Sequence, residues 1–201
     1  MKQAADLPGT PAPLEESHEA FPVLVSTVIS LRTRDAVTRA VSARVLKSAP
    51  DVKSMISIDR EELEKLLRPA GFFRQKAKQL KQTAELIQSR FEGEVPDNIE
   101  DLLSLPGVGR KTANFVLGMV FGKPAICVDV HVHRISNRLG LACTSSPEET
   151  EMQLQKMYPP EYWSRINHIM VTFGQRICKP VKPLCEVCPL STTCPVDTSK
   201  S

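Results

Sequence analysis

The chain has 201 residues, of which 41% are apolar and 24% charged, proportions typical of a globular protein and not of a disordered one. Its longest apolar runs, at 23–29 and 115–121, are far shorter than the ~18 residues that a membrane-spanning helix needs. Six cysteines without a secretory leader argue against a secreted or membrane protein. The net charge of +3 is compatible with a nucleic-acid partner but does not require one.

The first half of the chain shows helical patterns in succession. Prolines within residues 8–13 predict a loose or extended start. A helix rich in leucine is expected over 63–67 and ends at Pro69. Apolar residues then recur at steps of three and four over 77–91, which predicts an amphipathic helix. We expect the lysines of this segment, Lys76, Lys78 and Lys81, to lie on its solvated face.

Two short helices with a glycine turn between them are predicted next, at 97–104 and 109–121. Asp97 is a candidate cap of the first helix. Leu105 and Val108 flank the turn and are expected to pin the two helices together. Gly107 and Gly109 leave backbone N–H groups uncovered beside the start of the second helix, an arrangement that can bind an anion.

This arrangement resembles the helix-hairpin-helix motif, which grips the DNA backbone without reading bases. A glycine turn that opens a helix is also a common connector, so the motif alone does not decide the function. Later in the chain, Ser146 followed by Pro147 and Glu149 predicts another helix start. No stretch alternates at period two, and we therefore predict an all-α fold.

Four of the six cysteines cluster near the end as Cys178-x6-Cys185-x2-Cys188-x5-Cys194. Clustered thiols in a chain without a secretory signal indicate a metal site and not disulfides. By spacing alone zinc remains an alternative, although zinc modules more often carry two CxxC pairs. Cys127 and Cys143 fall outside this pattern and are expected to be buried free thiols.

Three motifs together carry a wider resemblance: Leu105-Pro-Gly-Val-Gly-Arg-Lys-Thr-Ala-Asn114, Val128-Asp-Val-His131 and the four cysteines. In this order they resemble the endonuclease III family of DNA glycosylases, from about residue 21 to residue 195. The resemblance implies a two-part helical fold. A helical barrel would span 14–123, with the hairpin at about 97–121, and residues 1–13 with 124–201 would form an iron-sulfur domain. The active site is expected between the two parts.

The resemblance implies that Lys111 is the nucleophile, which attacks the sugar C1′, expels the damaged base and forms a Schiff base that undergoes β-elimination. It implies that Asp129 takes a proton or stabilises positive charge on the sugar, and that His131 lies in or beside the pocket. From the residues alone, an ordinary phosphate contact at a helix start is the favoured interpretation of Lys111. For Asp129 the favoured interpretation is the N-cap of a helix over 130–139, a role that does not exclude catalysis.

The resemblance also implies a [4Fe–4S] cluster on Cys178, Cys185, Cys188 and Cys194. The loop between the first two ligands would touch DNA phosphate through Lys179 and Lys182. In the hairpin, the implied DNA-binding residues are Leu105, Gly107, Val108, Gly109 and Arg110.

Two loops are implied to fill the gap that an extruded nucleotide leaves in the duplex. One spans 30–35 and presents Arg32, where many relatives have glutamine, and this departure leaves the opposite-base preference open. The other spans 69–74 and presents Phe72, a candidate stacking wedge. Core packing is the alternative for Phe72.

The resemblance therefore implies an enzyme that excises oxidised pyrimidines, of the thymine glycol type, from duplex DNA and cleaves the strand at the abasic site. It would act as an intracellular monomer on damaged duplex DNA. One alternative is a mispair or uracil glycosylase with weak lyase activity. Others are a non-catalytic DNA-binding module and, more remotely, a zinc-stabilised scaffold protein.

Overall fold

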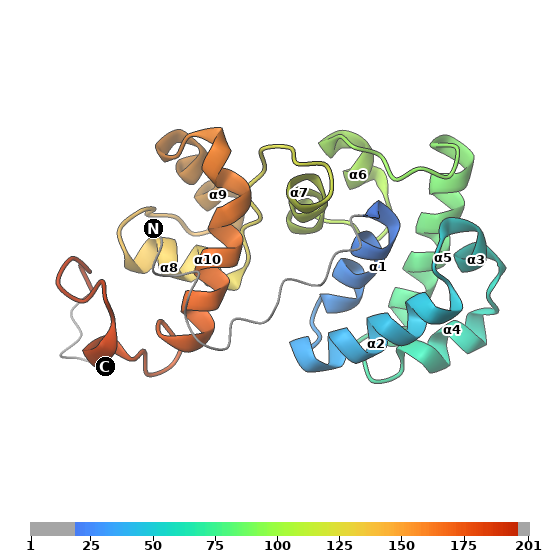
Figure 1. Ribbon diagram of the computed structural model, residues 1–201, viewed down its shortest axis with the longest axis horizontal. Coiled ribbons are helices and arrows are strands. Elements are labelled where there is room, and N and C mark those ends of the chain that lie inside the picture. The colour runs from blue at the N-terminus through green and yellow to red at the C-terminus, as the bar shows by residue number, and fades with distance from the viewer. Residues whose placement is uncertain (1–18, 197–201) are drawn as a thin grey trace. The chain divides into compact units, whose positions relative to one another are not determined.

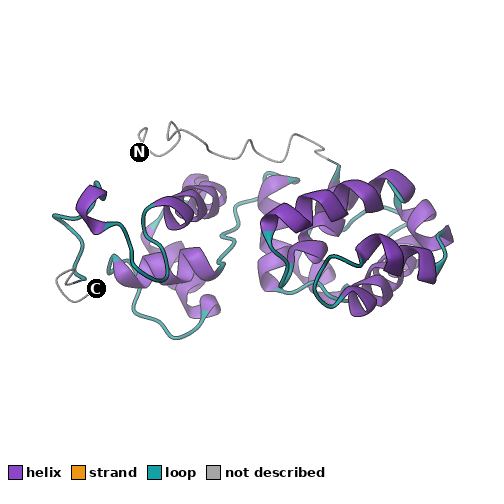
Figure 2. Cartoon of the chain, turned by 90° about the horizontal axis from the view of Figure 1, so that it is seen from below, coloured by secondary structure: helices purple, strands orange, loops and turns teal. Residues whose placement is uncertain are grey.

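The computed structural model describes residues 19–196, and within this range every regular element is helical (Figures 1 and 2). This confirms the predicted all-α fold. The chain forms two compact units that meet in sequence at Phe121 and Gly122. No helix among the described residues has the length and apolar character needed to cross a membrane.

The first unit is built from helices of 6 to 18 residues joined by short loops. Its helices are α1 (Ala20–Ser30), α2 (Asp35–Ser48), α3 (Val52–Ser57), α4 (Arg60–Leu67), α5 (Phe73–Arg90), α6 (Ile99–Ser104) and α7 (Arg110–Met119).

Among the described residues, the second unit has a segment without regular secondary structure at 122–129, followed by three longer helices and two short 3-10 turns. Its elements are α8 (Val130–Arg138), α9 (Pro147–Met157), η2 (Pro160–Tyr162), α10 (Trp163–Arg176) and η3 (Cys185–Val187). The predicted division after residue 123 stays a prediction. Its assignment of 1–13 to the second part lies outside the described residues.

The longest helix, α5, organises the first unit. It packs against α3 and α4 and also contacts α1. Ala77, Leu80, Ala84 and Ile87 form its buried stripe, as the apolar period predicts. The helix therefore supports both the loop that precedes it and, as shown below, the hairpin.

The predicted solvated lysine face of α5 is wrong for two of its three members. Lys78 is exposed, but Lys76 is only 4% exposed, and its ammonium group donates three hydrogen bonds within the protein. The Lys81 ammonium donates to the carbonyl oxygens of Ile56 and Ile58, at the end of α3. Burial of these two ammonium groups is favourable because carbonyl oxygens at the ends of α1 and α3, which lack partners within their helices, accept their hydrogen bonds.

The second unit has its own core around Ile126, Val132 and Leu154. Trp163 packs against this core and donates its indole N–H to the Tyr158 carbonyl at 2.7 Å. At the start of α9, Ser146 and Glu149 form the predicted capping box. Each unit thus contains buried apolar residues of its own.

Candidate functional site

The hairpin is formed by α6 and α7 and the turn between them. Asn98, and not Asp97, caps α6, because the Asn98 side-chain oxygen accepts from the Asp101 N–H at 2.9 Å. Leu105 is 2% and Val108 7% exposed, so both act as the apolar pins that the sequence predicts. The Val108 N–H donates to the Leu105 carbonyl at 3.1 Å and closes the turn.

The two hairpin glycines serve different purposes. Gly107 has a φ of +82°, and a Cβ there would lie 2.9 Å from the side chain of Gln79 on α5. Gly109 has an extended backbone and gives α7 no side-chain cap, and a Cβ there would meet no protein atom within 4 Å. Gly107 is needed for the turn itself, whereas Gly109 leaves open space beside the N-terminal end of α7.

Sequence reasoning missed the support that α5 gives to this turn. The Thr83 hydroxyl donates to the Pro106 carbonyl at 2.8 Å, and Thr83 is 1% exposed. Gln79 and Thr83 are four residues apart and so share one face of the helix. In the sequence, the only sign of this support was the polar pair itself, Gln79 and Thr83, next to the apolar stripe of α5.

The two predicted catalytic residues lie in different units. Lys111 is the second residue of α7 in the first unit, and its side chain is exposed. Asp129 is the N-cap of α8 in the second unit, which confirms that part of its predicted role. Its Oδ1 accepts from the N–H groups of His131 and Val132, both at 2.9 Å. These bonds fix the carboxylate through one oxygen and leave Oδ2 for other chemistry.

The histidines that follow Asp129 make separate contacts. His131 Nδ1 lies 3.1 Å from the Arg134 guanidinium, and Gly174 of α10 leaves the room, since a Cβ there would lie 2.5 Å from that nitrogen. His133 Nδ1 lies 2.7 Å from the Thr150 hydroxyl, a structural contact with α9. The two rings therefore face different partners, as expected for positions i and i+2.

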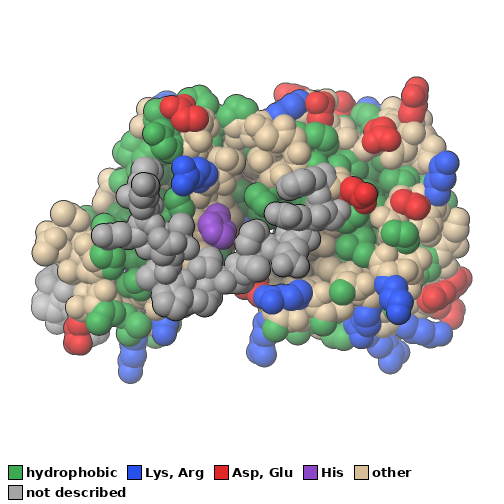
Figure 3. Space-filling view, viewed as in Figure 1, with side chains coloured by type: hydrophobic (Ala, Val, Ile, Leu, Met, Phe, Trp, Pro, Cys, Tyr) green, Lys and Arg blue, Asp and Glu red, His purple; other side chains and the backbone are tan. Residues whose placement is uncertain are grey.

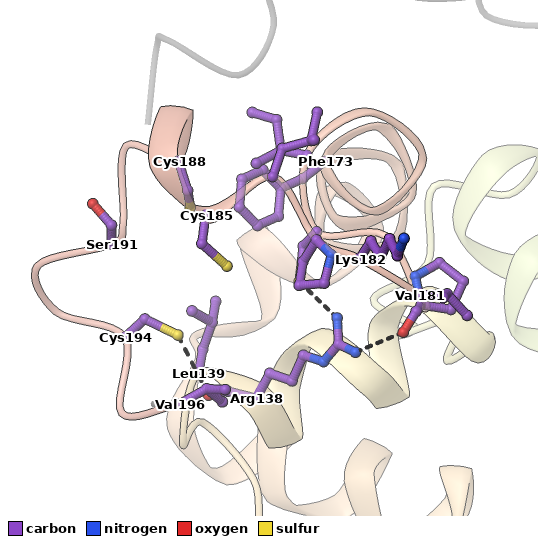
Figure 4. Close-up of a pocket in the computed structure, with 15 residues that line it drawn as sticks. Arg138, Leu139, Phe173, Val181, Lys182, Cys185, Cys188, Ser191, Cys194 and Val196 are labelled. Carbon is purple, nitrogen blue, oxygen red and sulfur yellow. Dashed lines mark hydrogen bonds between the residues drawn. The ribbon is translucent and has the colours of Figure 1, made fainter. Parts of the chain in front are cut away.

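The four clustered cysteines line one cavity of about 320 Å³ (Figure 4). Apolar residues, among them Leu139, Phe173 and Val181, form much of its wall. No three His, Cys, Asp or Glu side chains within 19–196 stand close enough to hold a metal ion as they lie. All six cysteines are free thiols, and Cys143 is exposed, so its predicted burial is wrong. Four thiols around one apolar cavity are nevertheless a donor set suited to a soft metal centre.

Two arginines of α8 hold the loop that begins at the first of these cysteines. Arg138 donates to the Lys179 carbonyl at 2.7 Å and the Pro180 carbonyl at 2.9 Å, and its guanidinium lies 3.5 Å from the Cys178 sulfur. Arg134 donates to the Cys178 carbonyl at 2.8 Å, and burial lowers the pKa of this guanidinium. These groups bind the loop backbone and leave the side chains of Lys179 and Lys182 exposed.

The two predicted gap-filling loops meet in the first unit. The Arg32 guanidinium carbon lies 5.4 Å from the centroid of the Phe72 ring, and Phe72 is 58% exposed, so core packing does not account for it. Figure 3 shows Lys and Arg side chains gathered along the edge of this unit that carries α2 and α4, the helices next to these loops in sequence. The structure thus brings Arg32 and Phe72 together.

Comparison with known proteins identifies the family. A model described as the HhH-GPD superfamily of base excision DNA repair proteins matches residues 25–160. Endonuclease III of Thermotoga maritima is 48% identical over 176 residues, which cover 88% of this chain and 83% of that protein. This chain belongs to the endonuclease III family.

Other relatives agree with this assignment. Endonuclease III-like protein 1 of Mus musculus is 40% identical over 178 residues, covering 87% of this chain and 59% of that protein. A solved structure of a trapped endonuclease III–DNA covalent intermediate superposes with a TM-score of 0.89 at 37% identity, over 96% of this chain and 91% of that one. The chain is thus a base excision repair enzyme of a glycosylase/lyase family, as the sequence predicts.

Proposed function

We propose that this enzyme removes oxidised pyrimidines from duplex DNA and then cleaves the strand at the abasic site, with Lys111 as the nucleophile. The observation that carries the proposal is the place of Lys111. It is an exposed lysine in the first turn of α7, two residues after the glycine that leaves open space at the helix start. A phosphate held at that helix start would bring the neighbouring sugar within reach of the amine.

In the proposed reaction, the Lys111 amine attacks C1′ of the damaged nucleotide. The C1′–N1 bond breaks and its electron pair leaves with the base. The nitrogen then passes a proton to O4′ as the C1′–O4′ bond breaks, so the sugar ring opens and a protonated Schiff base forms between Nζ and C1′. Removal of a C2′ proton then breaks the C3′–O bond, so that the 3′ phosphate leaves by β-elimination.

Asp129 is the proposed proton acceptor and counter-charge. An amine attacks only in its neutral form, whereas a free lysine, with a pKa near ~10.4, is protonated at neutral pH. Asp129 Oδ2 can take that proton or stabilise the positive charge that grows at C1′, while Oδ1 stays hydrogen-bonded to the start of α8. We place His131 beside the proposed active site because its backbone N–H is one of the groups that hold the Asp129 carboxylate in place.

DNA binding is assigned to two backbone-gripping surfaces. The first is the hairpin, where open space at Gly109 and the positive end of α7 favour a phosphate. Arg110 follows directly. The second is the loop that carries Lys179 and Lys182, both exposed. Contacts of this kind position the duplex and do not select its sequence.

We further propose that Cys178, Cys185, Cys188 and Cys194 hold a [4Fe–4S] cluster. The support is their shared cavity and the preference of iron-sulfur centres for thiolate ligands. When bound, the cluster would join the four thiolates and thereby brace the 179–184 loop, and the sugar chemistry stays with Lys111 and Asp129. Absorbance near ~400 nm distinguishes it from zinc, which is colourless.

Borohydride trapping on duplex DNA that contains thymine glycol tests the function. We expect a covalent adduct with the wild type and with Lys156→Ala, an exposed lysine of α9, and none with Lys111→Ala. Trapping by Lys111→Ala would move the nucleophile elsewhere. Excision of uracil or mispaired thymine in preference to thymine glycol would contradict the assigned lesion. The monomeric state and intracellular location stay predictions, and size-exclusion chromatography tests the first.

A further inference from the structure

The loops that carry Arg32 and Phe72 have unusual backbone conformations at both of these residues. Arg32 has a φ of 53° and Phe72 a φ of 57°, in the left-handed region that residues other than glycine rarely adopt. Their side chains also stack, with the guanidinium over the ring. Surrounding structure must hold both residues in these conformations, because neither adopts them readily on its own.

The two loops also approach each other through their backbones. A Cβ at Gly71 would lie 2.7 Å from the Arg32 carbonyl oxygen, a distance that real Cβ atoms do not reach. Any other residue at this position would push the loops apart. Gly71 therefore permits the contact but does not by itself fix it.

Lys76 supplies the fixing interaction. Its ammonium nitrogen donates to the Ile29 carbonyl at 2.8 Å, the Leu31 carbonyl at 2.6 Å and the Thr33 hydroxyl at 2.7 Å. These three acceptors use all three ammonium donors, and they lie on both sides of Arg32 in sequence. The Lys76 backbone N–H donates to the Phe72 carbonyl at 3.0 Å. This is the first helical hydrogen bond of α5, so the Phe72 loop leads directly into the helix whose Lys76 side chain holds the Arg32 loop.

We propose that Lys76 is a positioning residue that assembles Arg32 and Phe72 into one preformed wedge for the DNA duplex. The inference rests on the proposed gap-filling role of these two side chains. A wedge that already exists in the free protein avoids the cost of ordering two flexible side chains during DNA binding. Burial lowers the pKa of Lys76 to about 8, which still leaves the ammonium form, with its three donors, predominant at pH 7.

Lys81 provides a matched control. Its ammonium also lies on α5 and also donates to carbonyls at a helix end, those of Ile56 and Ile58. Those carbonyls belong to the end of α3 and not to either loop. Replacing each lysine with methionine removes the same kind of bond, and only the Lys76→Met change removes it from the wedge.

The experiment measures single-turnover strand cleavage on two substrates. One is a duplex with thymine glycol opposite 2-aminopurine, whose emission rises on unstacking, and the other is a single-stranded abasic oligonucleotide that has no gap to fill. We expect Lys76→Met to slow duplex cleavage by about tenfold or more and to weaken the emission change. The reason is that the reaction rate falls steeply when side chains that position the substrate are displaced. Single-strand cleavage should stay within about twofold of the wild type, and Lys81→Met should change both rates equally.

Two outcomes overturn the role of Lys76: equal losses on both substrates, or the same duplex-specific loss in Lys81→Met. Phe72→Ala separates this failure from failure of the wedge itself. If Phe72→Ala lowers only duplex cleavage and Lys76→Met does not, Lys76 is not the positioning residue. If Phe72→Ala also has no duplex-specific effect, the gap-filling assignment fails. Thr33→Val, which removes one acceptor and keeps the lysine, should give a smaller loss of the same kind, and it serves if Lys76→Met does not fold.

Discussion

Both units use a cation to hold a functional loop, but they do so in different surroundings. In the first unit, the buried Lys76 ammonium holds the Arg32 loop against a helix whose apolar face is packed. In the second, the Arg138 guanidinium holds the loop after Cys178, where Val181 is 75% and Val187 70% exposed. The first loop is supported by the polypeptide alone. The second has little packing of its own, so the four thiols beside it are expected to contribute through a bound metal centre.

The strongest test of this contrast removes one thiol. We expect Cys188→Ser to lose absorbance near ~400 nm and to make residues 178–196 sensitive to protease, since metal binding at such sites is coupled to folding. The first unit should stay resistant. Cys143→Ser, at an exposed cysteine outside the cavity, is the control and should behave as the wild type. A protease-resistant tail in metal-free Cys188→Ser would show that the polypeptide alone suffices there too.

The hairpin offers a second test within the first unit. Gly107→Ala forces a side chain into a left-handed conformation and should lower the free energy of unfolding by about 1–2 kcal/mol. Gly109 has an extended backbone and open space around it, so Gly109→Ala should leave the free energy of unfolding unchanged. The added methyl group would occupy the space proposed for a DNA phosphate and should weaken binding to abasic duplex DNA. Urea unfolding and a fluorescence-anisotropy titration measure the two effects. Equal destabilisation by both changes would contradict the separate roles of the two glycines.

The last test concerns pH, because Lys76 titrates in an accessible range and an arginine does not. Burial lowers the pKa of Lys76 in the folded state from 10.5 to about 8. Between pH 8 and pH 10.5 this lysine is therefore mostly protonated in the unfolded chain and mostly neutral in the folded one. Stability from this group therefore rises with pH across that window. The difference in unfolding free energy, wild type minus Lys76→Met, should be larger at pH 9.5 than at pH 7. A difference that falls with pH would mean that the ammonium form is favoured by folding.

The sequence predicted those features that depend on neighbouring residues. The capping box of Ser146 and Glu149, the N-cap role of Asp129 and the buried stripe of α5 all follow from spacings of two to four residues. The predictions for Lys76 and Lys81 were wrong because burial of a lysine depends on acceptors far along the chain. For Lys76 these are more than 40 residues away. The helical period gives the face of a residue but not the carbonyl oxygens that its side chain can reach.

The candidate site shows the same limit. Through the resemblance to the endonuclease III family, the motifs nominated Lys111, Asp129 and the four cysteines, because each lies in a short, ordered pattern, and their roles stay predictions. The contact between Arg32 and Phe72 joins positions 40 residues apart, and no local signal announces it. The support of the hairpin by Thr83 is equally non-local, since its acceptor is 23 residues away.

The position of Trp163 has a practical consequence. It is the chain's single tryptophan, and it packs against the core of the second unit. Its emission, excited at wavelengths that tyrosine does not absorb, will report the unfolding of that unit alone, while far-ultraviolet circular dichroism follows the helices of both. A denaturation curve read by fluorescence can therefore differ from one read by ellipticity without either being in error, and the gap between their midpoints would measure how independently the two halves of the molecule melt.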